Sequence, residues 1–360
     1  MKIAIFHNFM DNIGGAERVG LTLARELRAD FYTTNIDREK IEKMGFSDIK
    51  LKPIGRVPIN APFRHQKTLW KFRKLNLGKE YDFYIIDGDW AISGAVNNKP
   101  NLWYVHSPIR EIWDLYEYTR ENIVPLPLKP IFDVWVKYNR YLNKKYVNHA
   151  GKLVCNSENT QKRVRRYLNK EAIVINPPIE TSKFYYHKNG DYWLSVNRLI
   201  SHKRVDMQIK VFSKLPNEKL IIVGSYEKSR HFQTYADYIK KTKPENVKIL
   251  SWVDQKKLID LYANCKGFIT TTKDEDFGMT PIEAMASGKP VIAPNEGGYK
   301  ETVINNVTGK LIDDISVDKL VRAIEETGRD PERYKNACLR QAKKFDTDIF
   351  ISKIKDVIKN

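Results

Sequence analysis

The chain has 360 residues, with 62 Lys and Arg against 44 Asp and Glu, so its formal net charge is +18. A chain of this length favours two domains over one core, and no apolar stretch approaches the roughly 20 residues that a transmembrane helix needs. The first residues read as a strand and not as a signal peptide, and the three cysteines fit neither a disulfide framework nor a zinc site. We therefore expect a cytoplasmic protein whose positive charge binds phosphate groups, anionic lipids or nucleic acid.

Predicted strands and helices alternate through the first half of the chain. We expect strands at residues 2–6, 31–34, 81–87, 101–105, 153–156 and 172–175, and helices at residues 14–28, 64–74, 132–148 and 157–168. Residues 7–13 are predicted to form the loop between the first strand and the first helix. This alternation is typical of a parallel sheet with helices on its faces. The stiff turn Asn176-Pro177-Pro178 follows as the candidate linker.

Two features of the first half are candidates for a binding site. Gly14 and Gly15 lie at the predicted start of the first helix, where glycine lets a ligand approach free backbone N–H groups. Alone, such a pair is more often only a turn. His106 directly follows the strand at residues 101–105, and ligand sites form where parallel strands end. A histidine in that position can equally be structural.

The predicted helix at residues 64–74 is basic, with Leu69, Trp70 and Phe72 interleaved among its cations. This composition is typical of an interfacial helix that meets anionic lipids. The alternative is an ordinary surface helix with one buried edge, and the sequence leaves both open.

The second half restarts the alternation. Strands are expected at residues 192–196, 219–224, 247–250, 267–271 and 290–293, and helices at residues 255–264, 282–287, 317–326, 331–345 and 347–358, with a helix and a turn across residues 301–312. This order fits a second Rossmann-like sheet. Arg198 and Lys203 follow the strand at residues 192–196. There a guanidinium fork and an ammonium can hold a diphosphate, whereas without context the segment is only a basic loop.

Residues 267–303 join a strand, an acidic loop, a helix and a further strand. Thr280 is predicted to be the N-cap of that helix, and Pro281 suits its first turn. A helix N-terminus at the carboxyl edge of a parallel sheet offers N–H groups and a partial positive charge to a phosphate. Glu275 and Glu283 flank it. Glu283 is also spaced from Thr280 as in a capping box, which is a purely structural role.

The run EDFGMTPIEAMASGKPVIA at residues 275–293 resembles the signature of the family-4 retaining glycosyltransferases, whose paired glutamates have this spacing. Asp276 stands where the usual form has Gly, and Asn197 likewise replaces a usual Gly. The run HSPIREIWD at residues 106–114 resembles a signature of mannosyltransferases in this family. The resemblance covers essentially the whole chain and is strongest from residue 192 to residue 309.

The resemblance implies an α/β architecture in which two Rossmann-like domains face each other across a cleft, the GT-B fold. Residues 1–176 would form the acceptor-side domain, and residues 177–345 the domain that binds the nucleotide sugar. Residues 346–360 would form a C-terminal helix that packs back on the N-terminal domain.

The same resemblance implies roles for individual residues. The implied catalytic residues are His106 beside the transferred sugar, Arg198 and Lys203 on the departing diphosphate, and Glu275 on hydroxyl groups of the sugar. The implied substrate-binding residues are Gly14, Gly15, Arg110, Asn197, Gly224, Trp252, Val253, Phe277, Gly278, Met279, Thr280 and Glu283, the last on the ribose. Because cationic side chains can replace a metal at a diphosphate, we expect no metal and no cofactor.

The sequence therefore predicts a retaining hexosyltransferase that moves mannose from GDP-mannose to a lipid-linked or oligosaccharide acceptor in cell-surface glycan synthesis, at the inner face of a membrane. The mannose assignment depends on residues 106–114 alone, and a UDP-linked hexose is an alternative donor. A nucleotide-sugar epimerase of similar fold is a second alternative, and it would need no acceptor. Nucleic-acid binding rests only on charge, because the chain lacks a basic motif with stacking aromatics, and we expect none.

Overall fold

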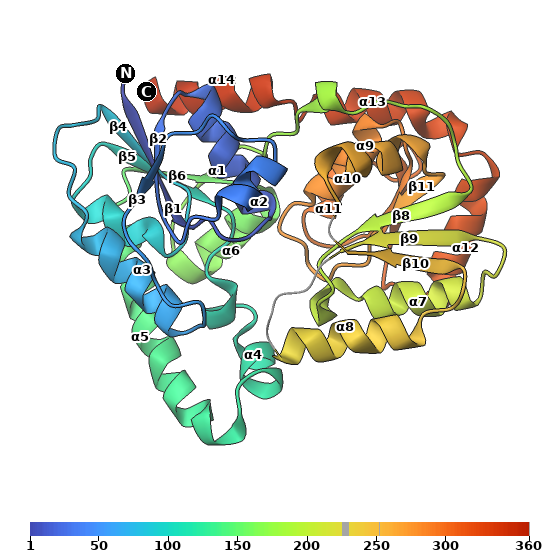
Figure 1. The fold of residues 1–360 in the computed structure, drawn as a ribbon, viewed down its shortest axis with the longest axis horizontal. Helices are drawn as coiled ribbons and strands as arrows, with labels where there is room; N and C mark the ends of the chain where they lie inside the picture. Colours follow the sequence, from blue (N-terminus) through green and yellow to red (C-terminus); the bar gives the residue numbers. More distant parts are fainter. Residues whose placement is uncertain (225–229, 252, 360) are drawn as a thin grey trace. The chain divides into compact units, whose positions relative to one another are not determined.

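The computed structural model describes residues 1–224, 230–251 and 253–359, which form two compact units, each built on one parallel sheet (Figure 1). The first unit comprises Met1–Asn176 and the segment that begins at Phe350, and the second comprises Pro177–Ile349. The boundary lies in the Asn176-Pro177-Pro178 turn, where proline stiffens the backbone. Within the described ranges, no helix combines the length and the apolar character that crossing a membrane requires.

The first unit holds a seven-stranded parallel sheet in the order β3-β2-β1-β4-β5-β6-β7. Its strands are β1 (Ile3–Phe9), β2 (Asp30–Thr34), β3 (Leu51–Pro53), β4 (Phe83–Ile86), β5 (Asn101–Val105), β6 (Lys152–Cys155) and β7 (Ile173–Val174). Its helices are α1 (Gly15–Glu26), α2 (Arg38–Lys43), α3 (Phe63–Lys74), α4 (Tyr116–Asn122), α5 (Lys129–Val147) and α6 (Glu158–Leu168), with the 3-10 helices η1 (Ala91–Val96), η2 (Arg110–Ile112) and η3 (Leu126–Leu128).

Both faces of this sheet are covered. On one face the ring of Phe6 lies 5.6 Å from that of Phe72 on α3, and Val136 of α5 belongs to the same core. On the other face the ring of Tyr104 meets that of Phe350 at 5.7 Å, where Phe350 lies on α14 (Thr347–Lys359). Strands buried on both faces are apolar throughout, which explains the uninterrupted FYII sequence of β4.

The second unit holds a six-stranded parallel sheet in the order β10-β9-β8-β11-β12-β13. Its strands are β8 (Tyr192–Val196), β9 (Lys219–Val223), β10 (Val247–Leu250), β11 (Gly267–Ile269), β12 (Val291–Pro294) and β13 (Gly309–Ile312). Its helices are α7 (Val205–Ser213), α8 (Arg230–Thr242), α9 (Gln255–Asn264), α10 (Met279–Ala286), α11 (Tyr299–Thr302), α12 (Val317–Arg329) and α13 (Lys335–Lys343), with η4 (Thr181–Lys183), η5 (Ser201–Lys203) and η6 (Glu332–Tyr334).

Neighbouring residues of these strands face two separate cores. Leu194 packs with residues of α9, α10 and α13 on one face, whereas Trp193 packs with residues of α7, α8 and α12 on the other. This alternation follows from the pleat, because successive side chains of a strand point to opposite faces. A sheet with helices on both faces leaves its carboxyl edge open for loops that carry function.

The predicted α/β class with two Rossmann-like sheets is confirmed, and β5, β8, β10 and α9 have the expected bounds. No bounds were predicted for the helices α2, α4, α7 and α8 or for the strands β3 and β13. In addition, β1 continues to Phe9, so that residues 7–9 belong to the strand and not to the predicted loop. The turn expected near Gly309 is instead the start of β13, which pairs with β12 at Val291. A Cβ on Gly309 would overlap the backbone of Val291, so a residue that normally weakens a strand is required here.

Candidate active site

In each sheet, the order in which the chain adds strands reverses beside the first strand of that unit. In the second unit β8 lies between β9 and β11, and in the first unit β1 lies between β2 and β4. Ligands of open parallel sheets bind outside the carboxyl ends of the strands at such a switch point. The connections that leave β8 and β11, and those that leave β1 and β4, are therefore the places to look for a site.

In the second unit, the switch point brings Lys203 and Glu275 together. Lys203 ends η5 after β8, Glu275 lies in the loop after β11, and 2.6 Å separates Nζ from Oε2. Arg198 lies in the same connection as Lys203. The side chains of Lys203 and Glu275 are only 15% and 20% exposed, so water screens their attraction less than it would at an open surface. The structure thus holds an ammonium beside a carboxylate where the sequence predicted both to touch a donor.

The connections that carry this pair are tied to each other. Thr271 Oγ1 donates to the carbonyl oxygen of Lys203 at 2.8 Å and to that of Arg204 at 3.0 Å. Arg204 Nε in turn donates to the carbonyl oxygen of Thr271 at 2.6 Å, and its guanidinium also pairs with Glu296. These bonds fix η5 against the loop after β11. The sequence singled out neither Arg204 nor Glu296, because partners this far apart in the chain leave no local pattern.

The glycine loop after β12 supports the backbone at Glu275. The N–H of Gly298 donates to the carbonyl oxygen of Glu275 at 2.8 Å, and Gly297 has a φ of +58°. A Cβ on Gly298 would overlap the backbone of Phe277, so only glycine lets the two loops approach this closely. The hydroxyl of Tyr299 donates to Glu275 Oε2 at 3.3 Å. Burial raises the pKa of Tyr299 well above 10, so this hydroxyl keeps its proton at neutral pH.

The helix that follows Glu275 begins earlier than predicted. Gly278, with a φ of +93°, is the N-cap of α10, and its first helical residue is Met279. The predicted N-cap at Thr280 is therefore wrong, and so is the capping box with Glu283 that depended on it. The physical reason is Gly278, whose positive φ turns the chain directly into the helix. Glu283 is buried instead, and the hydroxyl of Tyr262 donates to its Oε2 at 2.8 Å.

If Glu283 holds the ribose, Glu283→Gln should weaken donor binding about tenfold while the melting temperature stays nearly unchanged. The amide keeps an oxygen that can accept from Tyr262, whereas the ribose hydroxyls lose a charged acceptor, and bonds to charged groups exceed neutral ones by about 1 kcal/mol or more. Calorimetric titration with donor measures the first effect, and thermal unfolding the second. Tyr262→Phe is the control, because it keeps the carboxylate. Donor affinity equal to wild type in Glu283→Gln would remove the ribose role.

The remaining predicted residues of this unit lie near the same edge. The side-chain amide of Asn197 donates to Ser195 Oγ at 2.5 Å, so it turns back into the sheet. Its carbonyl oxygen lies where a Cβ on Gly224 would overlap it. Gly224 therefore lets the loops after β8 and β9 approach each other, which is why glycine is needed there. Val253 lies between β10 and α9, and Trp252 lies outside the described residues.

In the first unit, Asp87 directly follows β4 and lies between His7 of β1 and His106, which directly follows β5. Its Oδ2 accepts from His7 Nδ1 at 2.7 Å, and its Oδ1 accepts from His106 Nε2 at 2.8 Å. Asp87 is fully buried, whereas the side chain of His106 keeps 21% exposure. A carboxylate that accepts from Nε2 orients the imidazole of His106 and leaves Nδ1 as its remaining polar atom.

The charges of this cluster shift its proton equilibria. Burial by itself would raise the pKa of Asp87, but the charges and hydrogen bonds of His106 and His7 outweigh it, so this pKa is lowered. For His7, burial would lower the pKa, and the hydrogen bond and charge of Asp87 outweigh that effect, so the pKa is raised from 6.5. The cluster therefore carries an ionised carboxylate and favours a protonated His7.

The sequence missed His7 and Asp87, although a signal was present. Asp87 ends an otherwise apolar run, and an acid buried in such a place is costly unless it is paired. Of the residues predicted in this unit, Gly14 is the N-cap of α1 and Gly15 its first residue, beside the end of β1. Arg110 lies in η2, and its Nε donates to Asp114 Oδ2 at 2.9 Å.

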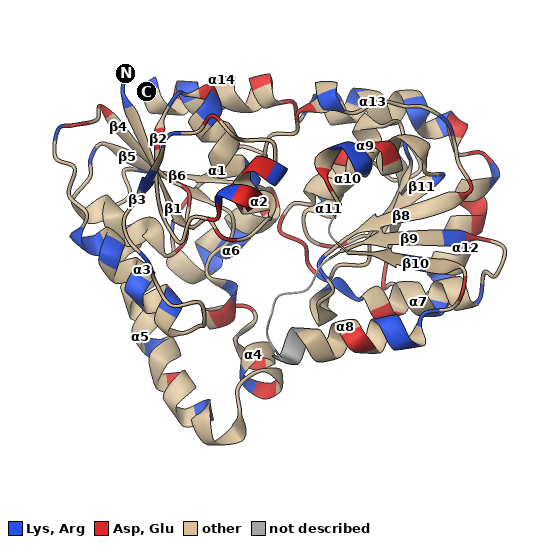
Figure 2. Cartoon of the chain, in the orientation of Figure 1, with Lys and Arg blue, Asp and Glu red and all other residues tan. Residues whose placement is uncertain are grey.

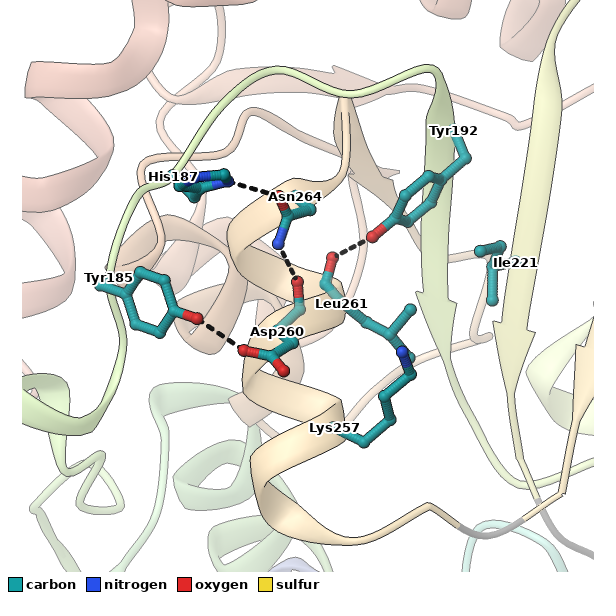
Figure 3. Close-up of a pocket in the computed structure, with 8 residues that line it drawn as sticks. All are labelled: Tyr185, His187, Tyr192, Ile221, Lys257, Asp260, Leu261 and Asn264. Atoms are coloured by element: carbon teal, nitrogen blue, oxygen red, sulfur yellow. Dashed lines mark hydrogen bonds between the residues drawn. The ribbon is translucent and has the colours of Figure 1, made fainter.

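A hollow of about 540 Å³ lies elsewhere in the second unit, between α9, β8 and the segment before β8 (Figure 3). Its lining residues are Tyr185, His187, Tyr192, Ile221, Lys257, Asp260, Leu261 and Asn264. Most of their polar atoms bond to one another, as in the contacts of Tyr185 with Asp260 (2.5 Å) and His187 with Asn264 (2.7 Å). Tyr192 begins β8, whereas Arg198 follows its end, so this hollow is separate from the site at the carboxyl edge.

Comparisons with known proteins show what the chain is similar to. Residues 180–345 match the family described as Glycosyl transferases group 1. The alpha-1,3/1,6-mannosyltransferase ALG2 of Dictyostelium discoideum is 25% identical over 100% of this chain and 98% of its own. The capsular polysaccharide biosynthesis glycosyltransferase CapM of Staphylococcus aureus is 32% identical over 39% of this chain and 38% of its own. HepE of Anabaena, solved with UDP and glucose, has a TM-score of 0.79 at 18% identity, with both chains covered fully. Residues 180–345 thus have the sequence of a group 1 glycosyltransferase domain, and the chain has the GT-B fold.

Proposed function

We propose that this glycosyltransferase moves mannose from GDP-mannose to a lipid-linked or oligosaccharide acceptor, with retention of configuration, in cell-surface glycan synthesis. The observation that carries the proposal is the Lys203–Glu275 pair at the switch point between β8 and β11. The choice of mannose is supported by the sequence at residues 106–114 and by similarity along the whole chain to proteins named alpha-1,3/1,6-mannosyltransferase.

The second unit would bind the donor. Lys203 and Arg198 neutralise the charge that grows on the departing diphosphate, which speeds the reaction because that charge is largest in the transition state. The first N–H groups of α10, which follow Gly278, would bind the same anion. Glu275 accepts hydrogen bonds from hydroxyl groups of the sugar, and Glu283 accepts hydrogen bonds from those of the ribose. With two cations in place, the diphosphate needs no metal ion.

The first unit would hold the acceptor and one side of the sugar. His106 is oriented by Asp87, so its Nδ1 is the atom available to a sugar hydroxyl. The backbone at Gly14 and Gly15, at the start of α1, would approach the diphosphate from this unit. Arg110, held by Asp114, would bind the substrate nearby. Each of these groups lies at the carboxyl edge of the first sheet or in the segment that follows it.

Retention of the anomeric configuration is best explained by a reaction in which both bonds change on the same face of the sugar. The bond from the anomeric carbon to the phosphate oxygen breaks, the acceptor oxygen bonds to that carbon on the same face, and the acceptor proton passes to the leaving phosphate. A retaining hydrolase instead uses a carboxylate nucleophile. Glu275 is a poor candidate for that role, because Lys203 and Tyr299 already bind its Oε2.

A UDP-linked hexose is the alternative donor, because HepE, which has a similar fold, is described with UDP and glucose. Either donor would be used at the inner face of a membrane if the acceptor is lipid-linked. A peripheral association with anionic lipid would then bring enzyme and acceptor together.

A thermal-shift screen with GDP-, UDP- and ADP-sugars, run in EDTA, tests donor class and metal independence together. A ligand at a hundredfold excess over its Kd stabilises the folded state by about 2.7 kcal/mol, so GDP-mannose should raise the melting temperature by about 2 °C or more. A shift with UDP-glucose alone would overturn the guanine assignment, and no shift with any sugar nucleotide would overturn the function. Donor consumed with an acceptor present, but not without it, separates a transferase from an epimerase.

A further inference from the structure

The outward face of α5 carries an unusual row of apolar side chains. Ile131, Val134, Tyr138 and Tyr141 follow one another at intervals of three, four and three residues, so they share one face of the helix. Each is between 48% and 68% exposed. The preceding η3 adds Leu126 and Leu128, exposed by 76% and 50%. Single exposed apolar residues are common, but a continuous row of this kind marks a surface that binds something.

The charges around this row are mostly positive. Lys137, Lys144 and Lys145 are exposed on the same helix, towards its C-terminal half. The only acidic residue of α5 is Asp133, and it is already bonded to Arg120 and Tyr116. Glu121 of α4 also lies beside the start of α5, where it pairs with Lys129. The face therefore combines an apolar tip with an excess of cations over acids.

The neighbouring helix α3 extends the same character. Phe72 of α3 and Val136 of α5 belong to the same core, and Figure 1 shows the two helices side by side. Phe63 and Trp70 are 70% and 51% exposed on α3. This helix has five Lys and Arg and no acidic residue, and the blue segments along α3 and α5 in Figure 2 show how the cations recur.

We propose that the outward faces of α5 and α3, with η3, dock on an anionic lipid surface. The apolar side chains enter the boundary between headgroups and acyl chains, while the lysines and arginines meet lipid phosphates. A second copy of the chain is the competing occupant, because the spacing on α5 also suits a helix pair. The excess of cations favours the lipid, since two such faces would bring more cations than acids together. The inference deepens the proposed function, in that it assigns the surface through which a lipid-linked acceptor is reached.

Flotation with vesicles of equal parts phosphatidylglycerol and phosphatidylcholine tests the inference without any sugar substrate. Wild type should float with these vesicles, less so at high salt, and should not float with phosphatidylcholine alone. The double variant Ile131→Glu/Val134→Glu should bind the anionic vesicles about tenfold more weakly or worse. Its matched control is Ile304→Glu/Val307→Glu, which introduces the same charges at apolar residues of the second unit that are 40% and 48% exposed.

Equal binding by wild type and Ile131→Glu/Val134→Glu would overturn the inference, and so would equal binding of wild type to neutral vesicles. Sedimentation of the free proteins checks the competing occupant, because a wild-type dimer that this variant separates would assign the face to self-association. Transfer to a dissolved oligosaccharide acceptor should be unchanged in the variant. If the protein transfers no sugar but binds vesicles through this face, the proposed function fails while the docking surface stands.

Discussion

Replacing Lys203 with Met should lower kcat by about 10²–10³-fold, the loss typical of removing one group that stabilises developing negative charge. The Nζ atom of Lys203 is held at the switch point between β8 and β11, 2.6 Å from Glu275, where a departing diphosphate would gain charge. Met fills a similar volume without the charge, so the effect is on the transition state more than on the fold. Steady-state kinetics with saturating donor measure it.

Lys266→Met is the matched control for this variant. Lys266 pairs with Glu218 at 2.7 Å, with side chains 20% and 22% exposed, so the ion pair resembles that of Lys203 in length and shielding. Lys266 precedes β11, however, and so lies at the opposite edge of the sheet. Both variants should lose a similar stability, about 1–3 kcal/mol, while only Lys203→Met loses turnover. Turnover that falls equally in both would show that the Lys203 pair is structural.

The second unit shows which parts of a fold the sequence can predict. β8, β10 and α9 have their expected bounds because apolar periodicity and clear ends define them locally. The start of α10 was predicted wrongly, because Thr280 is a better N-cap by composition than Gly278, and only the packing of the loop decides for glycine. β13 was missed for the same reason, since Gly309 reads as a turn until the backbone of Val291 is beside it.

The same distinction between local and long-range signals applies to the residues of the site. Residues with a local motif, such as Lys203 and Glu275, were predicted, and the structure brings them into contact. Tyr299 and Tyr262, which donate to Glu275 and Glu283, were missed because each meets its partner only through the fold. Sequence reasoning finds groups whose chemistry is marked by their neighbours in the chain. It does not find the groups that hold them in position.

Asp87 is such a positioning residue, and Asp87→Asn should lower kcat/KM by about a hundredfold. The amide can accept at only one atom, so it cannot serve His7 and His106 as the carboxylate does. His106 then loses its fixed orientation. Two controls bracket the variant: His7→Asn keeps the bond between Asp87 and His106 and should retain most activity, and Asp133→Asn removes a carboxylate from α5 of the same unit. Equal kcat/KM in Asp87→Asn and wild type would remove the positioning role.

The pH dependence of stability gives a second readout for Asp87→Asn. In wild type the lowered pKa of Asp87 contributes stability above 3.8, which is lost as the pH falls through its folded value. The raised pKa of His7 contributes stability below 6.5, which is lost as the pH rises through its folded value. Without the carboxylate, only the charges of Glu17 and Asp89 oppose the lowering of the His7 pKa by burial, so its stabilising contribution shrinks. The stability difference between wild type and variant should therefore be largest between these two values and shrink at higher pH, as denaturant unfolding across the range would measure. A difference that stays constant with pH would mean that His7 does not depend on Asp87 for its proton.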